Sequence, residues 1–323
     1  MEAKITAIGA YAPEKIIDNH YFESFIETSD EWIQSRTGII ERRFAAEDEY
    51  TSHLSVAAVR DLAKRYNKDI SDVDFILVAT VTHDQIMPSM GAQLQHRLEI
   101  PNAAALDISA ACAGFGYGIT LARGLIHSGM YRKILVVGAE TLSKVTDFTD
   151  RTSCILFGDG AGAILIEAAE KGGIGECIAG AEGNGGQDLY LSTRSTQVNG
   201  MPITANNKIV QNGRAVFRWA VTRMSEIFEA IVEKNGLSKD DIDWFIPHSA
   251  NMRIIEAICQ RVGFPVEKSL ESLSLYGNTS SASIPLALNE AVRAGKVKKG
   301  DKLLLLGFGG GLTYAGTVVE WGI

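Results

Sequence analysis

The sequence predicts an α/β protein built from two duplicated halves, whose mostly parallel sheets sandwich helices between them. Short apolar runs alternate with segments of helical periodicity, which is typical of α/β folds. In addition, Asp72-Val-Asp-Phe-Ile-Leu77 aligns with Asp241-Ile-Asp-Trp-Phe-Ile246 at an offset of 169 residues, and Leu135-Val-Val-Gly138 aligns with Leu304-Leu-Leu-Gly307 at that same offset of 169. An offset that recurs in the same order indicates an internal repeat.

The composition is that of an ordinary globular protein with a large core. The 323 residues are 46% hydrophobic and 22% charged, which fits about two domains or one duplicated unit. The formal net charge of −8 argues against general nucleic-acid binding, which favours a basic surface. The four cysteines form no C-x-x-C pair and no Cys/His cluster with zinc spacing, so we expect a reduced, cytoplasmic setting. We expect neither a signal peptide nor a membrane span.

The first half, residues 1–171, contains alternating strands and helices. Leu54, Ala58, Leu62 and Tyr66 recur every four residues, which predicts a helix. The expected elements are a strand at 3–9, a short helix capped by Ser29 or Asp30, a helix at 51–66, a strand at 72–79, a helix at 93–98, a buried strand at 103–108, a helix at 113–128, a strand at 133–138 and a Gly-rich turn into a strand over 157–166.

The second half, residues 172–323, repeats this alternation after an irregular start. Residues 172–212 are rich in Gly, Asn, Ser and Thr, which predicts a junction or excursion. The expected elements are a helix at 214–235, a strand at 241–246, helices at 252–262 and 283–294, a strand at 302–307 and a terminal strand that ends near Trp321. We expect the two halves to pack tightly as one unit.

Cys112 is the first candidate for chemistry. It lies in a bend of small residues between a predicted strand and a predicted helix. The free N–H groups and the positive dipole end of a helix stabilise a thiolate, which favours a nucleophile. A free cysteine is also often a small buried hydrophobe. The position by itself leaves both interpretations open.

Two residues of the second half are candidates to meet this thiol. At the repeat offset Cys112 corresponds to Ser281, which lies close to Asn278, and His248 ends a strand equivalent to the one that ends near Ala79. Strand ends of related halves tend to meet at one crevice. A cysteine, a histidine and an orienting amide indicate acyl transfer through a thioester. Taken singly, a strand-end histidine is more often structural, and an asparagine after glycine is more often a turn residue.

The remaining histidines and the C-terminal glycines are less specific. The segment Gly309–Gly311 is either a plain turn or a place where backbone N–H groups approach an oxyanion closely. The other histidines have polar neighbours and are expected to be solvated: His20, His53, His83, His96 and His127.

Several specific motifs run in order through nearly the whole chain. They are Thr28-Ser-Asp-Glu-Trp-Ile33, Arg36-Thr-Gly-Ile39, Asp107-Ile-Ser-Ala-Ala-Cys-Ala-Gly-Phe115, Phe157-Gly-Asp-Gly-Ala-Gly-Ala163, Pro247-His-Ser-Ala-Asn-Met-Arg253, Tyr276-Gly-Asn-Thr-Ser-Ser-Ala-Ser283 and Phe308-Gly-Gly-Gly311. This set resembles the β-ketoacyl-acyl-carrier-protein synthase III family. The resemblance implies the thiolase-like fold, a duplicated α/β architecture that agrees with the internal repeat.

The resemblance also implies a decarboxylative Claisen condensation. Cys112 would accept an acyl group from acyl-CoA, and His248 and Asn278 would assist decarboxylation of malonyl-acyl-carrier protein and stabilise the enolate. The backbone N–H groups of Cys112 and Gly310 would form the oxyanion hole. A neutral histidine and an amide donate hydrogen bonds to an enolate without supplying a premature proton. The implied chemistry requires no metal or redox cofactor, since the coenzyme A thioester is a substrate.

Further roles follow from the resemblance alone. The implied coenzyme A contacts are Trp32, Arg36, Arg151, Ala250 and Asn251, and an indole and a guanidinium suit adenine and phosphate. From its residue type alone, Trp32 is equally compatible with a core position. The candidate docking contacts for the acidic carrier protein are Arg214, Arg218 and Arg253, although such residues are more often an ordinary solvated face. The implied assembly is a homodimer, with no nucleic acid or membrane as partner.

Two positions depart from the family pattern. Many members have Gln after the active-site histidine, where this chain has Ser249, so the tunnel or the substrate preference is in question. Met87 lies where members often place an aromatic residue at the dimer-contacting end of the acyl pocket. Because methionine is flexible, the length and branching of the starter acyl group stay open.

Four alternatives remain at this point. Thiolases use a second cysteine near the C-terminal glycine loop, where this chain has none. A related condensing enzyme of polyketide synthesis would use the same three residue types. A dinucleotide-binding oxidoreductase would fit Gly114-x-Gly-x-Gly118 with Glu140, although this is not the G-x-G-x-x-G pattern. A non-catalytic acyl-binding protein is disfavoured because all three reactive residues are present.

Overall fold

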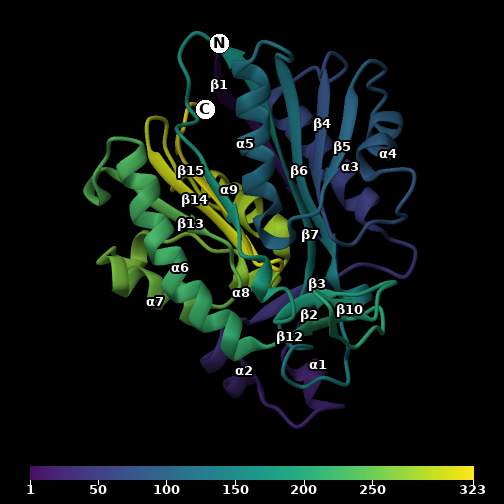
Figure 1. The fold of residues 1–323 in the computed structure, drawn as a ribbon. Helices are drawn as coiled ribbons and strands as arrows, with labels where there is room; N and C mark the ends of the chain where they lie inside the picture. The colour runs from purple at the N-terminus through teal and green to yellow at the C-terminus, as the bar shows by residue number, and fades with distance from the viewer.

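The computed structural model describes residues 1–323 and contains two sheets with a layer of helices between them (Figure 1). Runs of Ile, Leu and Val build the central strands, which are buried on both faces because helices cover both sides. The first sheet has the order β1 (Glu2–Tyr11), β7 (Asp159–Ala169), β6 (Lys133–Thr141), β4 (Phe75–Ala79) and β5 (Ala104–Ile108), and the second has the order β13 (Trp244–Pro247), β14 (Lys302–Gly309), β15 (Thr313–Glu320) and β8 (Ile178–Ala181).

The helices form three layers around these sheets. In the middle layer, α5 (Gly114–His127) contacts β6 and β15, and α9 (Ser283–Arg293) contacts β7 and β13, so both helices touch both sheets. The outer face of the first sheet is covered by α3 (Thr51–Tyr66) and α4 (Met90–Arg97), and that of the second by α6 (Gly213–Lys234) and α7 (Met252–Val262) (Figure 1). The predicted thiolase-like arrangement, with helices sandwiched between two sheets, is confirmed.

The glycines at the start of α5 allow this central helix to lie against both sheets. A Cβ added at Gly116 would lie 2.6 Å from the carbonyl oxygen of Ala315, and one added at Gly118 would lie 2.6 Å from a methyl group of Val136. Because these glycines face packed protein, they leave no room for a nucleotide. The dinucleotide-binding interpretation of this segment is therefore wrong.

The internal repeat is confirmed in detail at the helix starts. A 3₁₀ turn at Ala111–Ala113 leads into α5, and a 3₁₀ turn at Ser280–Ala282 leads into α9. Ala111 has φ +46° and the equivalent Ser280 has φ +50°, although neither is glycine. Such left-handed residues are uncommon outside glycine, so the same bend is built twice.

The expectation of mostly parallel sheets is wrong. Pairs β4–β5, β4–β6 and β13–β14 are parallel, whereas the other four pairs of the two sheets are antiparallel. An apolar strand that is buried on both faces has the same sequence pattern in either direction, so the pattern does not reveal its direction. The predicted burial of strand β5 is also only partial, since it forms the edge of its sheet and leaves Leu106 46% exposed.

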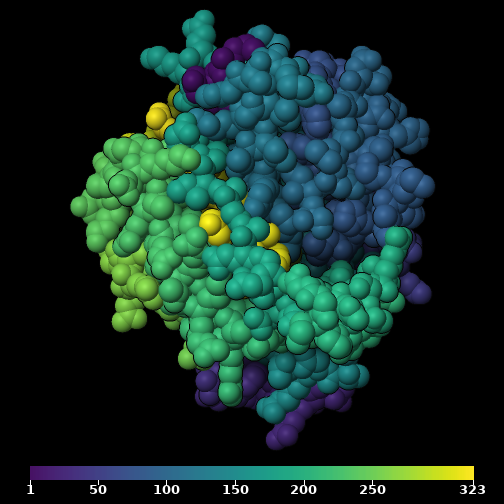
Figure 2. All heavy atoms as spheres, viewed as in Figure 1, coloured from purple at the N-terminus to yellow at the C-terminus, as the bar shows by residue number.

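The segment between the halves behaves as a junction followed by an excursion. Strand β8 joins the second sheet, and the chain then forms two small two-stranded sheets. In the space-filling view, the teal and green atoms of this segment lie below the two halves and above the purple N-terminal helices (Figure 2). The excursion contains β9 (Leu189–Leu191), β10 (Gln197–Val198), β11 (Met201–Pro202) and β12 (Ile209–Gln211).

The N-terminal helices and a hairpin complete the fold. Ser29 is the N-cap of α2, as predicted, because its side chain accepts a hydrogen bond from the backbone of Trp32 at 3.1 Å. None of the helices combines the length and the apolar character needed to cross a lipid bilayer. The remaining elements are β2 (Lys15–Asp18), β3 (Glu41–Phe44), α1 (His20–Glu23), α2 (Asp30–Thr37) and α8 (Leu273–Tyr276).

Candidate active site

A cavity of about 820 Å³ contains residues from both halves of the chain. Cys112 reaches it from the turn after β5, His248 directly follows β13, and Asn278 follows α8. Their side chains converge although they are far apart in the sequence, because equivalent strand ends of the two halves face each other. The structure thus brings the three predicted residues to one crevice.

Cys112 is held between the start of α5 and the C-terminal glycine segment. Its side chain is buried, and a Cβ added at Gly309 would lie 3.0 Å from Sγ. Gly310 also lines the cavity. Burial, with a smaller contribution from the charge of Glu140, raises the pKa of the thiol to about 12. The expected stabilisation of a thiolate by the helix start is therefore outweighed by desolvation, and the free protein holds a neutral thiol.

His248 is a neutral imidazole in this site. The residue is 2% exposed, and its ring packs edge-on against Phe308 with the ring centroids 5.2 Å apart. Burial lowers its pKa to about 3. Nδ1 lies 2.7 Å from Oγ of Ser283, so Nε2 is the ring nitrogen without a protein partner.

Backbone contacts fix the orientation of the Asn278 side chain. Its Oδ1 accepts a hydrogen bond from the backbone N–H of Ser280 at 2.9 Å, and the backbone N–H of Asn278 donates to the carbonyl of Leu156 at 2.8 Å. The amide nitrogen is therefore the end of the side chain that is available to a ligand. The bond from Ser280 to Oδ1 is an Asx turn, so Asn278 is a turn residue, as its sequence context suggests, while its side-chain nitrogen stays available in the cavity.

Glu140 is a buried carboxylate beside the site, and the only role that sequence reasoning offered it belonged to the dinucleotide-binding alternative. It accepts hydrogen bonds from the hydroxyl of Thr82 at 2.6 Å, the backbone N–H of Val81 at 3.2 Å and the hydroxyl of Ser281 at 3.2 Å. Burial raises its pKa to about 7. A glutamate at the end of a fully apolar strand was the available signal, since such a group needs partners.

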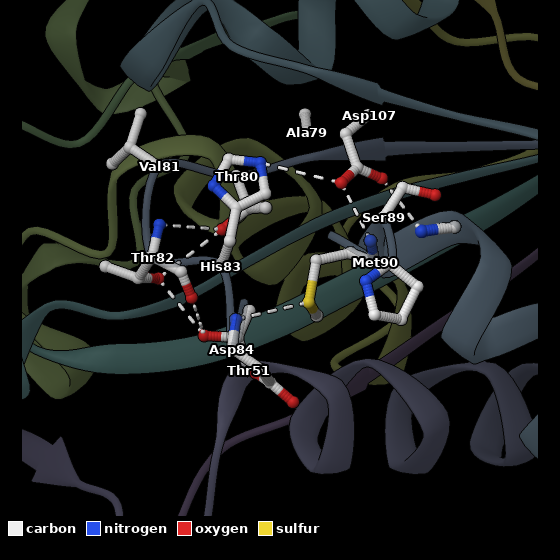
Figure 3. Close-up of polar contacts among 12 residues, drawn as sticks. Thr51, Ala79, Thr80, Val81, Thr82, His83, Asp84, Ser89, Met90 and Asp107 are labelled. Atoms are coloured by element: carbon white, nitrogen blue, oxygen red, sulfur yellow. Dashed lines mark hydrogen bonds and ion pairs between the residues drawn. The ribbon is translucent and has the colours of Figure 1, made fainter. Parts of the chain in front are cut away.

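His83 belongs to the cavity wall, so the expectation that it is solvated is wrong. Its Nε2 lies 3.6 Å from Oδ2 of Asp107, and the Asp107 carboxylate accepts hydrogen bonds from the backbone N–H groups of Met90 and Gly91 at the start of α4 (Figure 3). The histidine side chain is 24% exposed and lines the cavity. Across the chain, no three or more His, Cys, Asp and Glu side chains gather where they could hold a metal ion.

The predicted coenzyme A contacts surround one end of the cavity. Trp32, Arg36, Ala250 and Asn251 line it, and the guanidinium of Arg151 lies 5.5 Å from the centre of the Trp32 ring. The side-chain amide of Asn251 donates to the carbonyl of Arg36 at 3.1 Å and so connects the two halves. Trp32 is 37% exposed, so the alternative that it is a core residue is wrong.

The predicted docking residues and Met87 lie outside the cavity. Arg214, Arg218 and Arg253 are exposed and form no ion pair. Met87 is 86% exposed and does not line the cavity of its own chain, whereas the neighbouring Ile86 does. The predicted role of Met87 at a dimer contact stays a prediction. Ser249 is also absent from the cavity wall and is fully buried behind it.

Comparisons with known proteins agree with this geometry. Residues 106–183 match the family "3-Oxoacyl-[acyl-carrier-protein (ACP)] synthase III", and residues 232–321 match its C-terminal region. The chain is 52% identical over 323 residues to the beta-ketoacyl-[acyl-carrier-protein] synthase III 2 of Bacillus subtilis, with 100% of this chain and 99% of the relative covered.

Solved structures show the same architecture. The β-ketoacyl-[acyl carrier protein] synthase III of Thermus thermophilus is 45% identical and superimposes with a TM-score of 0.95, with 99% of each chain covered. The priming β-ketosynthase of the R1128 polyketide pathway is 35% identical with a TM-score of 0.93, covering 99% of this chain and 96% of that one.

Proposed function

The chain belongs to the 3-oxoacyl-[acyl-carrier-protein] synthase III family, and on this premise we propose that Cys112, His248 and Asn278 carry out its reaction. The protein is an acyltransferase that condenses an acyl-CoA starter with malonyl-acyl-carrier protein, releases CO2 and initiates fatty acid synthesis. The observation that carries the residue assignment is the single cavity in which a thiol from one half faces an imidazole and an amide from the other.

In the first step, the sulfur of Cys112 attacks the thioester carbonyl of acyl-CoA. A carbon–sulfur bond to Cys112 forms, the bond to coenzyme A breaks, and coenzyme A leaves with the proton of the thiol. The backbone N–H groups of Cys112 and Gly310 stabilise the oxyanion of the tetrahedral intermediate. Because Gly310 carries no side chain, its backbone can come close to the reacting carbonyl.

In the second step, malonyl-acyl-carrier protein loses CO2 beside the acylated Cys112. The electron pair of the broken carbon–carbon bond moves into the thioester carbonyl, and the resulting enolate oxygen receives hydrogen bonds from the imidazole of His248 and the amide of Asn278. A histidine whose pKa is about 3 is a neutral donor and does not protonate the carbanion. The carbanion then attacks the acyl carbon, a carbon–carbon bond forms and the carbon–sulfur bond to Cys112 breaks. The β-ketoacyl-acyl-carrier protein leaves, and the Cys112 thiolate takes up a proton from water.

The exposed end of the cavity suits coenzyme A. Trp32 and Arg151 provide an aromatic face and a guanidinium that already stack on each other, with 5.5 Å between the guanidinium carbon and the ring centre. Arg36 adds a cation for phosphate, and Ala250 and Asn251 line the path of the pantetheine arm inward.

The carrier protein docks beside this opening on the first turns of α6 and α7. Arg214 and Arg218 lie on α6 and flank Phe217, which lines the cavity, and Arg253 lies on the first turn of α7. All three cations are exposed and lack acidic partners within the chain, so they are available to an acidic protein.

The protein acts as a cytoplasmic homodimer in this proposal. Strand β5 is an open sheet edge that exposes Leu106, and the nearby loop exposes Ile86 and Met87 at 65% and 86%. An unpaired edge with apolar side chains is suited to pairing with a second copy.

Acylation tests the nucleophile. Wild-type protein incubated with acyl-CoA is expected to gain the mass of one acyl group, measured on the intact protein, and Cys112→Ser is expected to gain none. Cys154→Ser is the matched control, because Cys154 is buried but does not line the cavity. Acylation of the Cys112→Ser variant would remove the assignment.

Decarboxylation tests the second-half pair. With malonyl-acyl-carrier protein, His248→Ala and Asn278→Ala are each expected to slow CO2 release by about a hundredfold or more while Cys112 is still acylated. Unchanged CO2 release in both variants would contradict the proposed roles.

A starter panel separates fatty acid synthesis from priming of a polyketide pathway. Condensation rates with acetyl-, isobutyryl-, isovaleryl- and octanoyl-CoA report which acyl groups the wall formed by His83, Ile86 and Val81 accepts. A preference for short or branched starters supports the fatty-acid role, and exclusive use of an unusual starter supports the polyketide role.

A further inference from the structure

Three buried serines lie directly behind His248, on the side away from the cavity. Ser249, Ser272 and Ser283 are 0%, 2% and 0% exposed. The backbone N–H of Ser249 donates to Oγ of Ser283 at 3.3 Å, and Oγ of Ser283 lies 2.7 Å from Nδ1 of His248. None of the three serines lines the cavity.

The other two serines hold Ser283 in place. The hydroxyl of Ser272 donates to the backbone carbonyl of Ser283 at 3.0 Å, and the backbone N–H of Ser272 donates to Oγ of Ser249 at 3.0 Å. These bonds connect β13, the start of α8 and the start of α9. The hydroxyl of Ser283 therefore has a defined place relative to the imidazole.

The direction of the bond between Ser283 and His248 follows from counting hydrogens. A hydroxyl has one hydrogen to donate, and Oγ of Ser283 already accepts from Ser249. Nδ1 of His248 is the other polar atom within hydrogen-bond distance of this hydroxyl. If Nδ1 carried the ring proton, the buried hydroxyl hydrogen would have no acceptor, which native interiors avoid.

We propose that Ser283 is a positioning residue whose hydroxyl donates to Nδ1 of His248 and thereby fixes the imidazole as its Nε2–H tautomer. In this tautomer the ring N–H points to the cavity, where it donates to the enolate oxygen. The opposite tautomer would present a lone pair to a negatively charged oxygen and would repel it. This inference rests on the proposed function for its catalytic consequence but not for the tautomer itself.

The tautomer is measured directly by long-range ¹H–¹⁵N correlation spectra of protein labelled with ¹⁵N-histidine, with the His248 signals identified by their loss in His248→Gln. In wild type, Nε2 is expected to carry the proton and Nδ1 to be unprotonated. In Ser283→Ala, a population with the proton on Nδ1 is expected. A wild-type spectrum with the proton on Nδ1 would overturn the proposal without any variant.

Activity gives the second readout. Ser283→Ala is expected to lower kcat for decarboxylation of malonyl-acyl-carrier protein by about tenfold to a hundredfold, the range found when a partner that orients a metal-bound histidine is removed, with KM nearly unchanged. Acylation of Cys112 is expected to continue, which reports that the variant is folded. Ser283→Thr keeps the hydroxyl and is expected to recover both the tautomer and the rate.

Ser249→Ala is the matched control, because the Ser249 hydroxyl does not contact the imidazole and the backbone N–H of Ser249, which donates to Ser283, remains. It is expected to keep the Nε2–H signal. A Ser283→Ala variant with an unchanged spectrum and an unchanged decarboxylation rate would refute the positioning role. Wild-type protein that shows the Nε2–H tautomer but releases no CO2 would instead refute the proposed function and leave the tautomer assignment standing.

Discussion

The surroundings of Cys112 in the first half and of Ser281 in the second have equivalent backbone positions but carry different side chains. At the repeat offset of 169 residues, Gly309 beside Cys112 corresponds to Glu140 beside Ser281. A Cβ at Gly309 would lie 2.8 Å from Cβ and 3.0 Å from Sγ of Cys112, so a side chain there would collide with Cys112, and glycine keeps the sulfur uncovered. In the second half, the Glu140 carboxylate accepts a hydrogen bond from Ser281 at 3.2 Å and covers the equivalent position.

The backbone frame of the two places is alike. Gly307 and its equivalent Gly138 both allow the opposite 3₁₀ turn to approach: a Cβ at Gly307 would lie 3.0 Å from the carbonyl oxygen of Cys112, and one at Gly138 would meet the carbonyl oxygen of Ser281. The difference between the halves is therefore one of side chains. The duplicated halves share the same backbone arrangement. The absence of a side chain at Gly309 leaves Cys112 open to substrate, whereas Glu140 covers Ser281.

The largest effect is expected when a side chain is added beside Cys112, at Gly309. Gly309→Glu is expected to lower the rate of Cys112 acylation by about a hundredfold or more, because the new side chain displaces the acyl carbonyl from the sulfur. The rate is measured by intact mass in a single turnover. Gly124→Ala is the control, since a Cβ there meets nothing within 4 Å. Acylation of Gly309→Glu at the wild-type rate would mean that the open space is not needed.

The pH dependence of the two half-reactions sharpens the comparison. Burial raises the pKa of Cys112 to about 12, so the thiolate fraction, and with it the acylation rate, is expected to rise about tenfold per pH unit between about pH 6 and 9. Burial lowers the pKa of His248 to about 3, so decarboxylation is expected to be nearly flat over the same range. Rapid-quench measurements of each step check both slopes. A flat acylation profile would show that substrate binding activates the thiol.

Removing the Glu140 carboxylate beside Ser281 is expected to affect the stability of the fold more than the rate of the reaction. Glu140→Ala leaves the N–H of Val81 and the hydroxyl of Thr82 without this acceptor, whereas the Ser281 hydroxyl keeps the carbonyl of Ala79 at 2.8 Å. We expect the free energy of unfolding to fall by about 2–4 kcal/mol, measured by urea denaturation. A loss within the error of the wild-type value would show that the cluster is not stabilising.

The free energy of unfolding is also expected to depend on pH through Glu140. Burial raises the pKa of Glu140 from 4.5 to about 7, so the folded protein holds this proton more tightly than the unfolded chain. The resulting stabilisation is complete below about pH 4.5 and is lost as the pH rises to about 7. Compared with Glu140→Gln, the wild-type protein is therefore expected to lose stability more steeply across this interval. Parallel curves for the two proteins would contradict the raised pKa.

The smallest effect is expected when a thiol is introduced at Ser281, beside Glu140 in the second half. Ser281→Cys puts a thiol at the position equivalent to Cys112, but Glu140 occupies the space in front of it. We expect intact mass to show a single acyl group as in wild type, and a loss of stability of about 1 kcal/mol from the weaker hydrogen bond. A second acyl group on Ser281→Cys would show that both places accept substrate.

Local patterns in the sequence determined much of this protein. Periodicity placed the helix at 51–66 as the structure has it, because core-facing residues recur every turn whatever the partner is. The repeat offset related Cys112 to Ser281 and led to His248 as the strand-end residue that would meet it, because duplicated strands end at equivalent points. The family motifs supplied the chemical roles.

Only the tertiary structure decided the features that depend on distant partners. Strand direction, the place of His83 in the cavity wall and the outward position of Met87 are not encoded in a local pattern. The contacts of Glu140 with Ser281 and of His248 with Ser283 join residues 141 and 35 positions apart. The pKa values of Cys112 and His248 likewise depend on burial between two sheets, which arises only when the halves pack together.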